Sequence, residues 1–134
     1  MKLPDRRNRA ISATSEAIEA ALAAAIAIDD KKGLDIQLLD VSELLVVTDV
    51  FVIASGTSNR HVRSLADDVE GKLKADMARL PLRREGREYS TWVLLDYGDM
   101  VVHVFDQETR DYYQLERLWA DAPVIEFEPA PSEA

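Results

Sequence analysis

The stretch from residue 89 to 105 limits the possible fold most, because two runs of β-branched and aliphatic residues flank Tyr97-Gly98. A glycine in a two-residue loop supplies the positive φ that tight hairpins require, so this pattern predicts an antiparallel hairpin. Side chains alternate between the two faces of a strand. One face of the hairpin is then wholly apolar and should pack on the core: Val93, Leu95, Met100, Val102 and Val104.

The other face of the hairpin is mixed, with one aromatic ring, one imidazole and two carboxylates. A two-residue turn places Asp96 opposite Asp99 and Trp92 opposite His103. Like charges directly opposite each other destabilise a sheet, so the two aspartates indicate either a cationic partner or simply a polar turn. Because a core does not favour such a mixture, this face is predicted to lie outside the core.

The length of 134 residues and the mass of 15.0 kDa suit one folded domain. We expect a loose polar tail over 1–12, the domain over 13–122, and a short segment with an acidic tail over 123–134. The chain has no cysteine, which excludes disulfides and thiolate metal sites and favours a cytoplasmic location. Its most apolar run, 17–28, is too short to span a bilayer.

The remaining pattern predicts a mixed α/β sheet of four to five strands flanked by helices. Isoleucine and leucine at 18, 22 and 26 mark the buried stripe of the first helix, which Ser12 or Thr14 can begin and Gly33 can end. The predicted elements are a helix over 13–32, strands over 35–41 and 46–55, a helix over 60–78, a charged loop over 83–88, the hairpin, a helix over 108–119 and an edge segment over 124–127.

Charge is distributed unevenly along the chain. The total is −9, while residues 60–87 carry net +3 and residues 88–134 carry net −9. A net negative protein repels polyanions, so nucleic acid is not expected as the primary partner, although the positive stretch leaves direct RNA binding as a weaker possibility. A basic protein is a more suitable partner for the acidic half, and the same charge also keeps a protein soluble.

The turn Gly56-Thr57-Ser58 lies between a buried strand and a helix, where backbone N–H groups can bind phosphate. One alternative function is therefore a nucleotidyl- or phosphoryl-transfer enzyme that uses this turn. Such enzymes hold magnesium with paired carboxylates on a strand, whereas the nearest acids here, Asp67 and Asp68, are adjacent on a helix. Two histidines without cysteine are too few for zinc, and no catalytic set is apparent, so we predict no enzyme, metal or cofactor.

Several short motifs resemble, in order and spacing, those of the ribosomal silencing factors, also called Iojap-like proteins. Each motif is weak alone, but together they are specific across about 13–121. They are Leu39-Asp-Val41, Thr48-Asp-x-Phe-Val-Ile53, Gly56-Thr-Ser-x-Arg-His-Val62, Glu85-Gly86, Trp92-x-Leu-Leu-Asp-Tyr-Gly-Asp99, Val102-His-Val-Phe105 and Tyr113-x-Leu-Glu-x-Leu-Trp119.

The resemblance implies a nucleotidyltransferase-like shape without the catalytic carboxylates. It implies that the chain binds the large ribosomal subunit through its basic protein number fourteen, blocks joining of the small subunit and represses translation when nutrients are short. Organellar relatives assist assembly of the large subunit. The implied contact residues are Trp92, Leu94, Asp96, Tyr97, Asp99 and His103, with Thr48 and Asp49 nearby. The same face can also pair with itself, so a homodimer is expected away from the ribosome.

Overall fold

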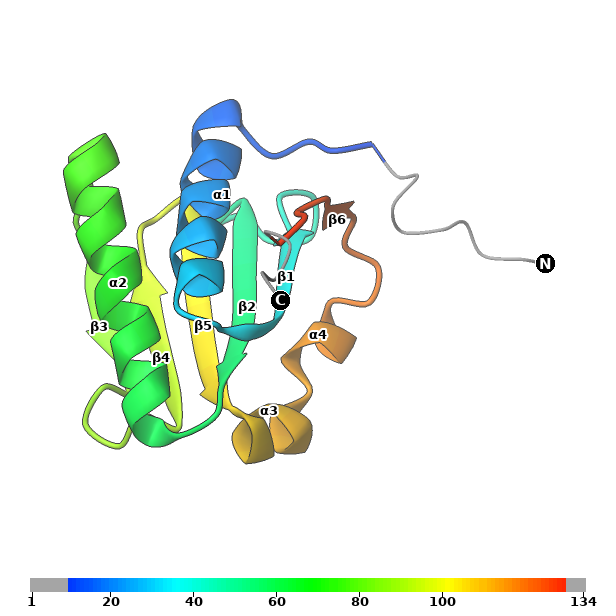
Figure 1. The fold of residues 1–134 in the computed structure, drawn as a ribbon. Helices are drawn as coiled ribbons and strands as arrows, with labels where there is room; N and C mark the ends of the chain where they lie inside the picture. Colours follow the sequence, from blue (N-terminus) through cyan, green and yellow to red (C-terminus); the bar gives the residue numbers. More distant parts are fainter. Residues whose placement is uncertain (1–9, 130–134) are drawn as a thin grey trace.

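The computed structural model describes residues 10–129, which form one sheet with helices packed against it (Figure 1). The parts of the predicted tails at 1–9 and 130–134 lie outside the described residues. The elements are α1 (Ser15–Asp30), β1 (Leu34–Asp40), β2 (Val50–Gly56), α2 (Asn59–Met77), β3 (Arg83–Glu85), β4 (Trp92–Asp96), β5 (Met100–Asp106), α3 (Gln107–Tyr113), α4 (Leu115–Leu118) and β6 (Val124–Ile125).

The strands pair in the order β3-β4-β5-β2-β1-β6, and only the central pair β2/β5 is parallel. Helices α1 and α2 lie side by side over one face of this sheet (Figure 1). The predicted α/β class is confirmed, but six strands exceed the predicted four to five. The stretch expected to be a charged loop contains β3, whose three exposed residues pair with β4 at the edge of the sheet.

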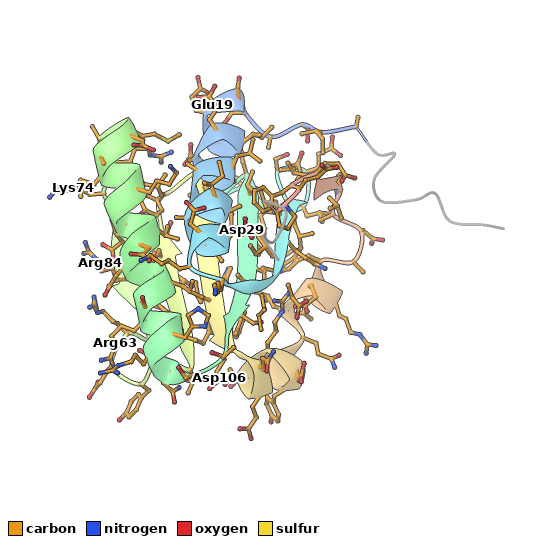
Figure 2. The ribbon with its side chains drawn as sticks, viewed as in Figure 1. Glu19, Asp29, Arg63, Lys74, Arg84 and Asp106 are labelled. Atoms are coloured by element: carbon orange, nitrogen blue, oxygen red, sulfur yellow. The ribbon has the colours of Figure 1, made fainter. Side chains whose placement is uncertain are left out.

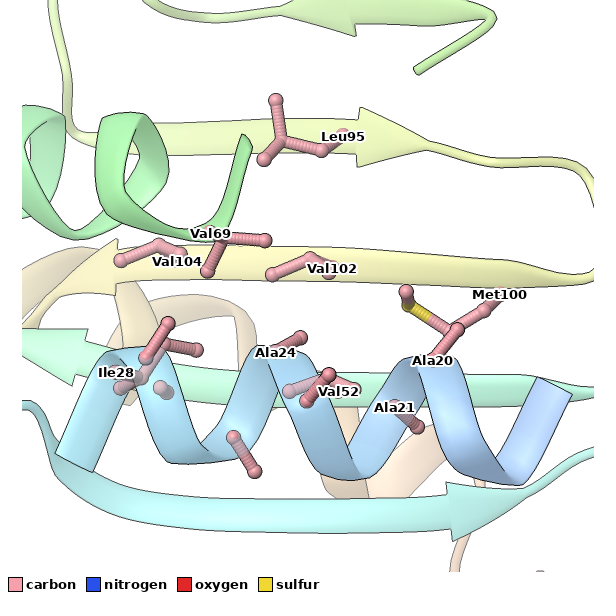
Figure 3. Close-up of a cluster of buried hydrophobic side chains, with 14 of the residues drawn as sticks. Ala20, Ala21, Ala24, Ile28, Val52, Val69, Leu95, Met100, Val102 and Val104 are labelled. Carbon is pink, nitrogen blue, oxygen red and sulfur yellow. The ribbon is translucent and has the colours of Figure 1, made fainter. Parts of the chain in front are cut away.

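Helix α1 packs on the sheet through its alanines. Thr14 caps its start, as predicted, by accepting a hydrogen bond from the Ala17 N–H. The predicted stripe is wrong in part, because Ile26 is 43% exposed while the alanines at 20, 21, 24 and 25 have no exposed surface. Methyl groups let the helix axis approach β2 and β5 closely, so their valines fill the interface (Figure 3).

The end of α1 also differs from the prediction. The helix cap is Lys31, and Lys32 rather than Gly33 takes a positive φ, of 63°. The Gly33 N–H donates to the Ile28 carbonyl at 2.8 Å, and a Cβ on this glycine would lie 2.2 Å from Ile28 Cγ2. Glycine is therefore needed here for space rather than for a left-handed backbone.

Helix α2 lies within one residue of the predicted range 60–78 at each end. Ser58 is the N-cap, and its hydroxyl accepts a hydrogen bond from the His61 N–H at 3.0 Å. The helix ends where Ala78 adopts a left-handed conformation. Its buried side is an apolar stripe that joins α1 and the sheet in one core: Val62, Leu65, Ala66, Val69 and Leu73.

The β4/β5 hairpin exists, but its predicted register is wrong by two residues. Asp96 pairs with Val101 and Leu94 with His103, so three residues, 97–99, connect the strands, and the Tyr97 N–H donates to the Met100 carbonyl. A shift of two keeps every side chain on its predicted face. The predicted apolar face accordingly lies in the core beneath the helices.

The predicted helix over 108–119 is broken into α3 and α4. Asp106 caps α3 by accepting a hydrogen bond from the Thr109 N–H at 2.7 Å. Gln114 then takes a φ of 48°, which stops the α-helix and turns the chain into α4. Within residues 10–129, no helix has both the length and the hydropathy that a membrane crossing requires.

Replacing Ala24 by leucine should lower the free energy of unfolding by about 1–3 kcal/mol, because a larger side chain must fit between a close-packed helix and sheet. The control is Ile26→Ala at the exposed position, which should cost less than about 1 kcal/mol. Urea denaturation followed by circular dichroism measures both. Equal losses would contradict an interface built on the alanines.

Candidate functional site

The face of the sheet opposite α1 and α2 holds a second apolar cluster, which the sequence did not predict. Leu39, Phe51, Ile53, Val101 and Phe105 from the sheet pack with Val41, Leu115 and Ala122. The mixed face of the hairpin belongs to this cluster, so the expectation that it lies outside the core is wrong. The β-sheet therefore buries apolar side chains on both faces.

A groove of about 280 Å³ opens on this face, and we call it the sheet groove. Its apolar walls come from three places in the chain: Leu45, Val47, Phe51, Leu82, Leu94 and Val101. Its polar lining includes Thr48, Arg83, Asp96 and His103. Four of the predicted contact residues, Thr48, Leu94, Asp96 and His103, are thus brought together.

His103 is a buried, neutral imidazole. It is 5% exposed, and burial lowers its pKa to about 4. The Trp92 indole N–H donates to His103 Nδ1 at 3.1 Å. Since the indole nitrogen can only donate, Nδ1 must be the unprotonated nitrogen and Nε2 carries the proton. Nε2 is buried and has no hydrogen-bond partner within residues 10–129.

Trp92 packs into the aromatic part of this face. Its ring centroid lies 4.7 Å from that of Phe105 and 5.1 Å from that of Tyr113, and the His103 ring meets Phe51 edge-on at 4.8 Å. Trp92 pairs with Phe105 rather than with the predicted His103 across the hairpin. The side chains of Trp92 and His103 nevertheless lie close together, as predicted, because they form the hydrogen bond described above.

The two aspartates of the hairpin do not face each other. Asp96 accepts a hydrogen bond from the Gly98 N–H at 2.8 Å and lies 3.7 Å from the Arg83 guanidinium. Asp99 is held by both terminal nitrogens of Arg79, at 2.7 and 3.3 Å. The predicted like-charge pair is therefore absent, and an arginine of the same chain accompanies each carboxylate.

Three predicted contact residues are engaged elsewhere in the fold. Tyr97 is 4% exposed and lies in the core beneath the helices, where burial raises its pKa to about 12. Asp49 accepts a hydrogen bond from the Thr14 N–H at the start of α1, and Asp99 is the partner of Arg79. These residues support the hairpin and α1, whereas the groove residues remain the candidates for contact.

The turn Gly56-Thr57-Ser58 uses its hydrogen-bonding groups within the chain. The Thr57 N–H donates to His61 Nδ1 at 2.9 Å, and the His61 N–H donates to the Ser58 hydroxyl. His61 Nε2 in turn lies 2.7 Å from the Lys31 carbonyl. A Cβ on Gly56 would lie 2.9 Å from the Val62 nitrogen, so this glycine allows α2 to pack closely. The arrangement is that of a helix cap.

A larger hollow of about 690 Å³ lies at the carboxyl ends of the parallel strands. The buried Arg110 guanidinium donates to the Ser55 hydroxyl at 2.8 Å and to Glu116 at 3.3 Å, which ties α3 and α4 to β2. Asp35 and Asp111 also line it, so its lining is net acidic and disfavours phosphate. Among residues 10–129, no three His, Cys, Asp or Glu side chains gather as a metal site would require.

Several basic side chains of the positive stretch 60–87 are paired with acidic neighbours. Its basic side chains project from α2 and β3, where Lys74 and Arg84 lie on the outside of the molecule (Figure 2). Ion pairs in this stretch are Arg84 with Glu70 at 2.7 Å, Arg87 with Asp67 at 2.9 Å and Lys72 with Asp76 at 2.9 Å. Such pairing weakens the field that phosphate binding would need.

Sequence reasoning missed Val47, Phe51 and Leu82 as residues of the groove. The predicted strand over 46–55 included Val46 and Val47, but β2 begins at Val50 and both valines are exposed before it. Leu82 follows a proline and precedes charged residues, so nothing in its local pattern indicated that β3 would carry it next to the hairpin.

Comparison with known proteins identifies the family. The family model described as "Ribosomal silencing factor during starvation" matches residues 14–134. The chain belongs to the ribosomal silencing factors. Ribosomal silencing factor RsfS of Bacillus subtilis is 42% identical over 106 residues, which are 78% of this chain and 88% of that protein.

Two further comparisons agree. Ribosomal silencing factor RsfS of Chromobacterium violaceum is 45% identical over 93 residues, covering 69% of this chain and 75% of that protein. A crystal structure of a protein from the same organism matches with a TM-score of 0.75 and 39% identity, and it covers 87% of this chain and 93% of that one. The resemblance found in the motifs is confirmed, and the sheet groove is a feature of a ribosomal silencing factor.

The His103 imidazole should remain neutral at pH 5.5 with its proton on Nε2, where ¹⁵N NMR of the imidazole can detect it. Because burial lowers its pKa from 6.5 to about 4, the unfolded chain binds a proton in this range that the folded chain does not. The free energy of unfolding should therefore fall as the pH drops from 6.5 to 4, by roughly 2–3 kcal/mol for this group. A titration midpoint near 6.5 would contradict the buried, neutral state.

Proposed function

We propose that this ribosomal silencing factor binds the large ribosomal subunit through its protein number fourteen and so prevents the small subunit from joining. Membership of the family supports the ribosome as the target. The observation that carries the proposal is the sheet groove, a partly apolar hollow bordered by the hairpin whose residues carry the family motif. In the cytoplasm, such binding would repress translation when nutrients are limited.

Charge favours a basic protein partner over ribosomal RNA. Residues 88–134, which include β4 and β5, carry net −9, and the Asp96 carboxylate lies at the groove with its Arg83 neighbour 3.7 Å away. Opposite charges speed encounter with a basic surface, and the excess of negative charge limits adherence to RNA. The ion pairs on α2 and β3 neutralise part of the positive charge that phosphate would need.

The proposed mechanism is steric exclusion, which requires no reaction. A folded body of 15.0 kDa that occupies part of the joining surface competes with the small subunit for the same space. The equilibrium of subunit joining then shifts by the free energy with which the factor binds, and this shift grows with its concentration. Control of translation would follow from the abundance of the factor.

Away from the ribosome, we propose that two copies pair through the same face. The exposed Val46, Val47 and Leu82 side chains give this face an apolar surface that a second copy can cover. A two-fold pairing uses the same patch twice, so it would close without forming filaments. Pairing and ribosome binding would then compete.

Asp96→Lys should weaken co-sedimentation with large subunits at least tenfold, because it places a cation at the groove facing a basic partner. Asp30→Lys makes the same charge change at the exposed end of α1, on the helical side of the sheet, and should bind as the unmodified chain does. Urea denaturation verifies that both variants fold.

In the same experiment, addition of small subunits should yield fewer joined ribosomes with the unmodified chain and with Asp30→Lys than with Asp96→Lys. Unaltered binding of Asp96→Lys to the large subunit would contradict the proposed docking face. Absence of binding by the unmodified chain would overturn the proposed function itself.

A further inference from the structure

The sheet groove extends the docking face beyond the hairpin. Val47 and Leu82 line it with their side chains 81% and 77% exposed, although apolar side chains gain free energy by leaving water. They come from two separate connections, the one that precedes β2 and the one that precedes β3. The groove is therefore walled by apolar groups that the free chain leaves in water.

The groove also contains two buried polar groups without partners. Thr48 is 4% exposed and His103 is 5% exposed, and Thr48 Oγ1 and His103 Nε2 make no hydrogen bond within residues 10–129. Both residues line the groove. Since Trp92 donates to Nδ1, the free nitrogen of His103 is an N–H donor, and the Thr48 hydroxyl can donate as well. Buried polar atoms without a hydrogen-bond partner are unusual, because most buried polar atoms in proteins are paired.

We propose that the sheet groove receives one uncharged side chain of the basic ribosomal protein, apolar along its length and ending in an acceptor oxygen such as a hydroxyl or carboxamide. This inference rests on the proposed function and assigns the chemistry of its central contact. The oxygen accepts from the His103 N–H, the Thr48 hydroxyl hydrogen-bonds a polar atom of the same partner segment, and Val47 and Leu82 cover the apolar part. Neither polar atom reaches solvent in the free chain, so the side chains that cover them move as the occupant enters.

The chemistry of the groove separates two kinds of partner residue. Lysine and arginine have donors and no acceptor, so their ends cannot satisfy the His103 N–H. They suit the Asp96 carboxylate at the groove instead, where a cation finds a partly exposed counter-charge. A neutral acceptor in the groove and a cation beside Asp96 together describe a short basic segment with one Ser, Thr, Asn or Gln.

The two orphaned groups make an acceptor particularly favourable for binding. Thr48 Oγ1 and His103 Nε2 are already buried away from water in the free chain, and neither forms a hydrogen bond there. An arriving oxygen therefore forms its bonds without a further desolvation cost on this side of the interface. The same reasoning predicts opposite effects on stability and binding when the hydroxyl of Thr48 is removed.

The first test is Thr48→Val, which keeps the shape of the side chain and removes its hydroxyl. The variant should be at least as stable to urea as the unmodified chain, because an unpaired buried group is lost. Its affinity for large subunits in quantitative co-sedimentation should fall about three- to tenfold, the effect of one hydrogen bond. Equal affinity for the two chains would overturn the inference.

The second test addresses the walls. Val47→Ser and Leu82→Ser should each weaken binding about tenfold with little change in stability, because both side chains are exposed in the free chain. Leu80→Ser is the matched control: its side chain is 60% exposed nearby in sequence but does not line the groove, and it should bind within twofold of the unmodified chain. Equal behaviour of Leu80→Ser and Leu82→Ser would overturn the inference.

The outcomes also distinguish the inference from the function on which it rests. If the unmodified chain fails to bind large subunits, both are wrong. If it binds and Asp96→Lys does not, while Thr48→Val binds normally, the docking face stands and the acceptor contact is wrong.

Discussion

The fold depends on the strict alternation of side chains along β2 and β5, the parallel pair at the centre of the sheet. One set of residues, including Val52, Val102 and Val104, packs beneath the helices, and the other set, including Phe51 and His103, faces the opposite way. Beneath α1 the strands present valines, since α1 contacts them through alanine. Most of the buried rings of the strands gather on the other side, where no long helix covers them and a groove remains.

The hydrogen bond from Trp92 to His103 connects this architecture to the proposed site. It fixes the tautomer of the imidazole and places the indole against Phe105 and Tyr113. A histidine with one nitrogen satisfied and the other unpaired is costly in an apolar cluster, and burial keeps it neutral. An interface can compensate this cost at the moment a partner arrives, which gives the groove a preference for one kind of group.

The alternation of side chains along the strands also explains which predictions from the sequence were correct. The two faces of the hairpin were assigned correctly because the true register differs by two residues, the period of a strand. The turn itself was wrong because Tyr97 enters the core and Arg79 holds Asp99, and both contacts come from residues distant in the sequence. The buried alanines of α1 were missed in part because isoleucine and leucine give a stronger local pattern. The groove could not be predicted, since Leu82 reaches it only through the pairing of β3 with β4.

The internal ion pairs change how the acidic hairpin is to be understood. A partner must compete with Arg83 for Asp96 and with Arg79 for Asp99, and the second competition is harder because Arg79 binds through two nitrogens. Part-exposed pairs of this kind contribute little to stability, so the chain loses little when Asp96 exchanges its arginine for a cation of the partner. Charge would then guide the approach, and the apolar walls with their two unpaired donors would select the residue that is finally bound. This division assigns specificity to the groove and association rate to the surface around it.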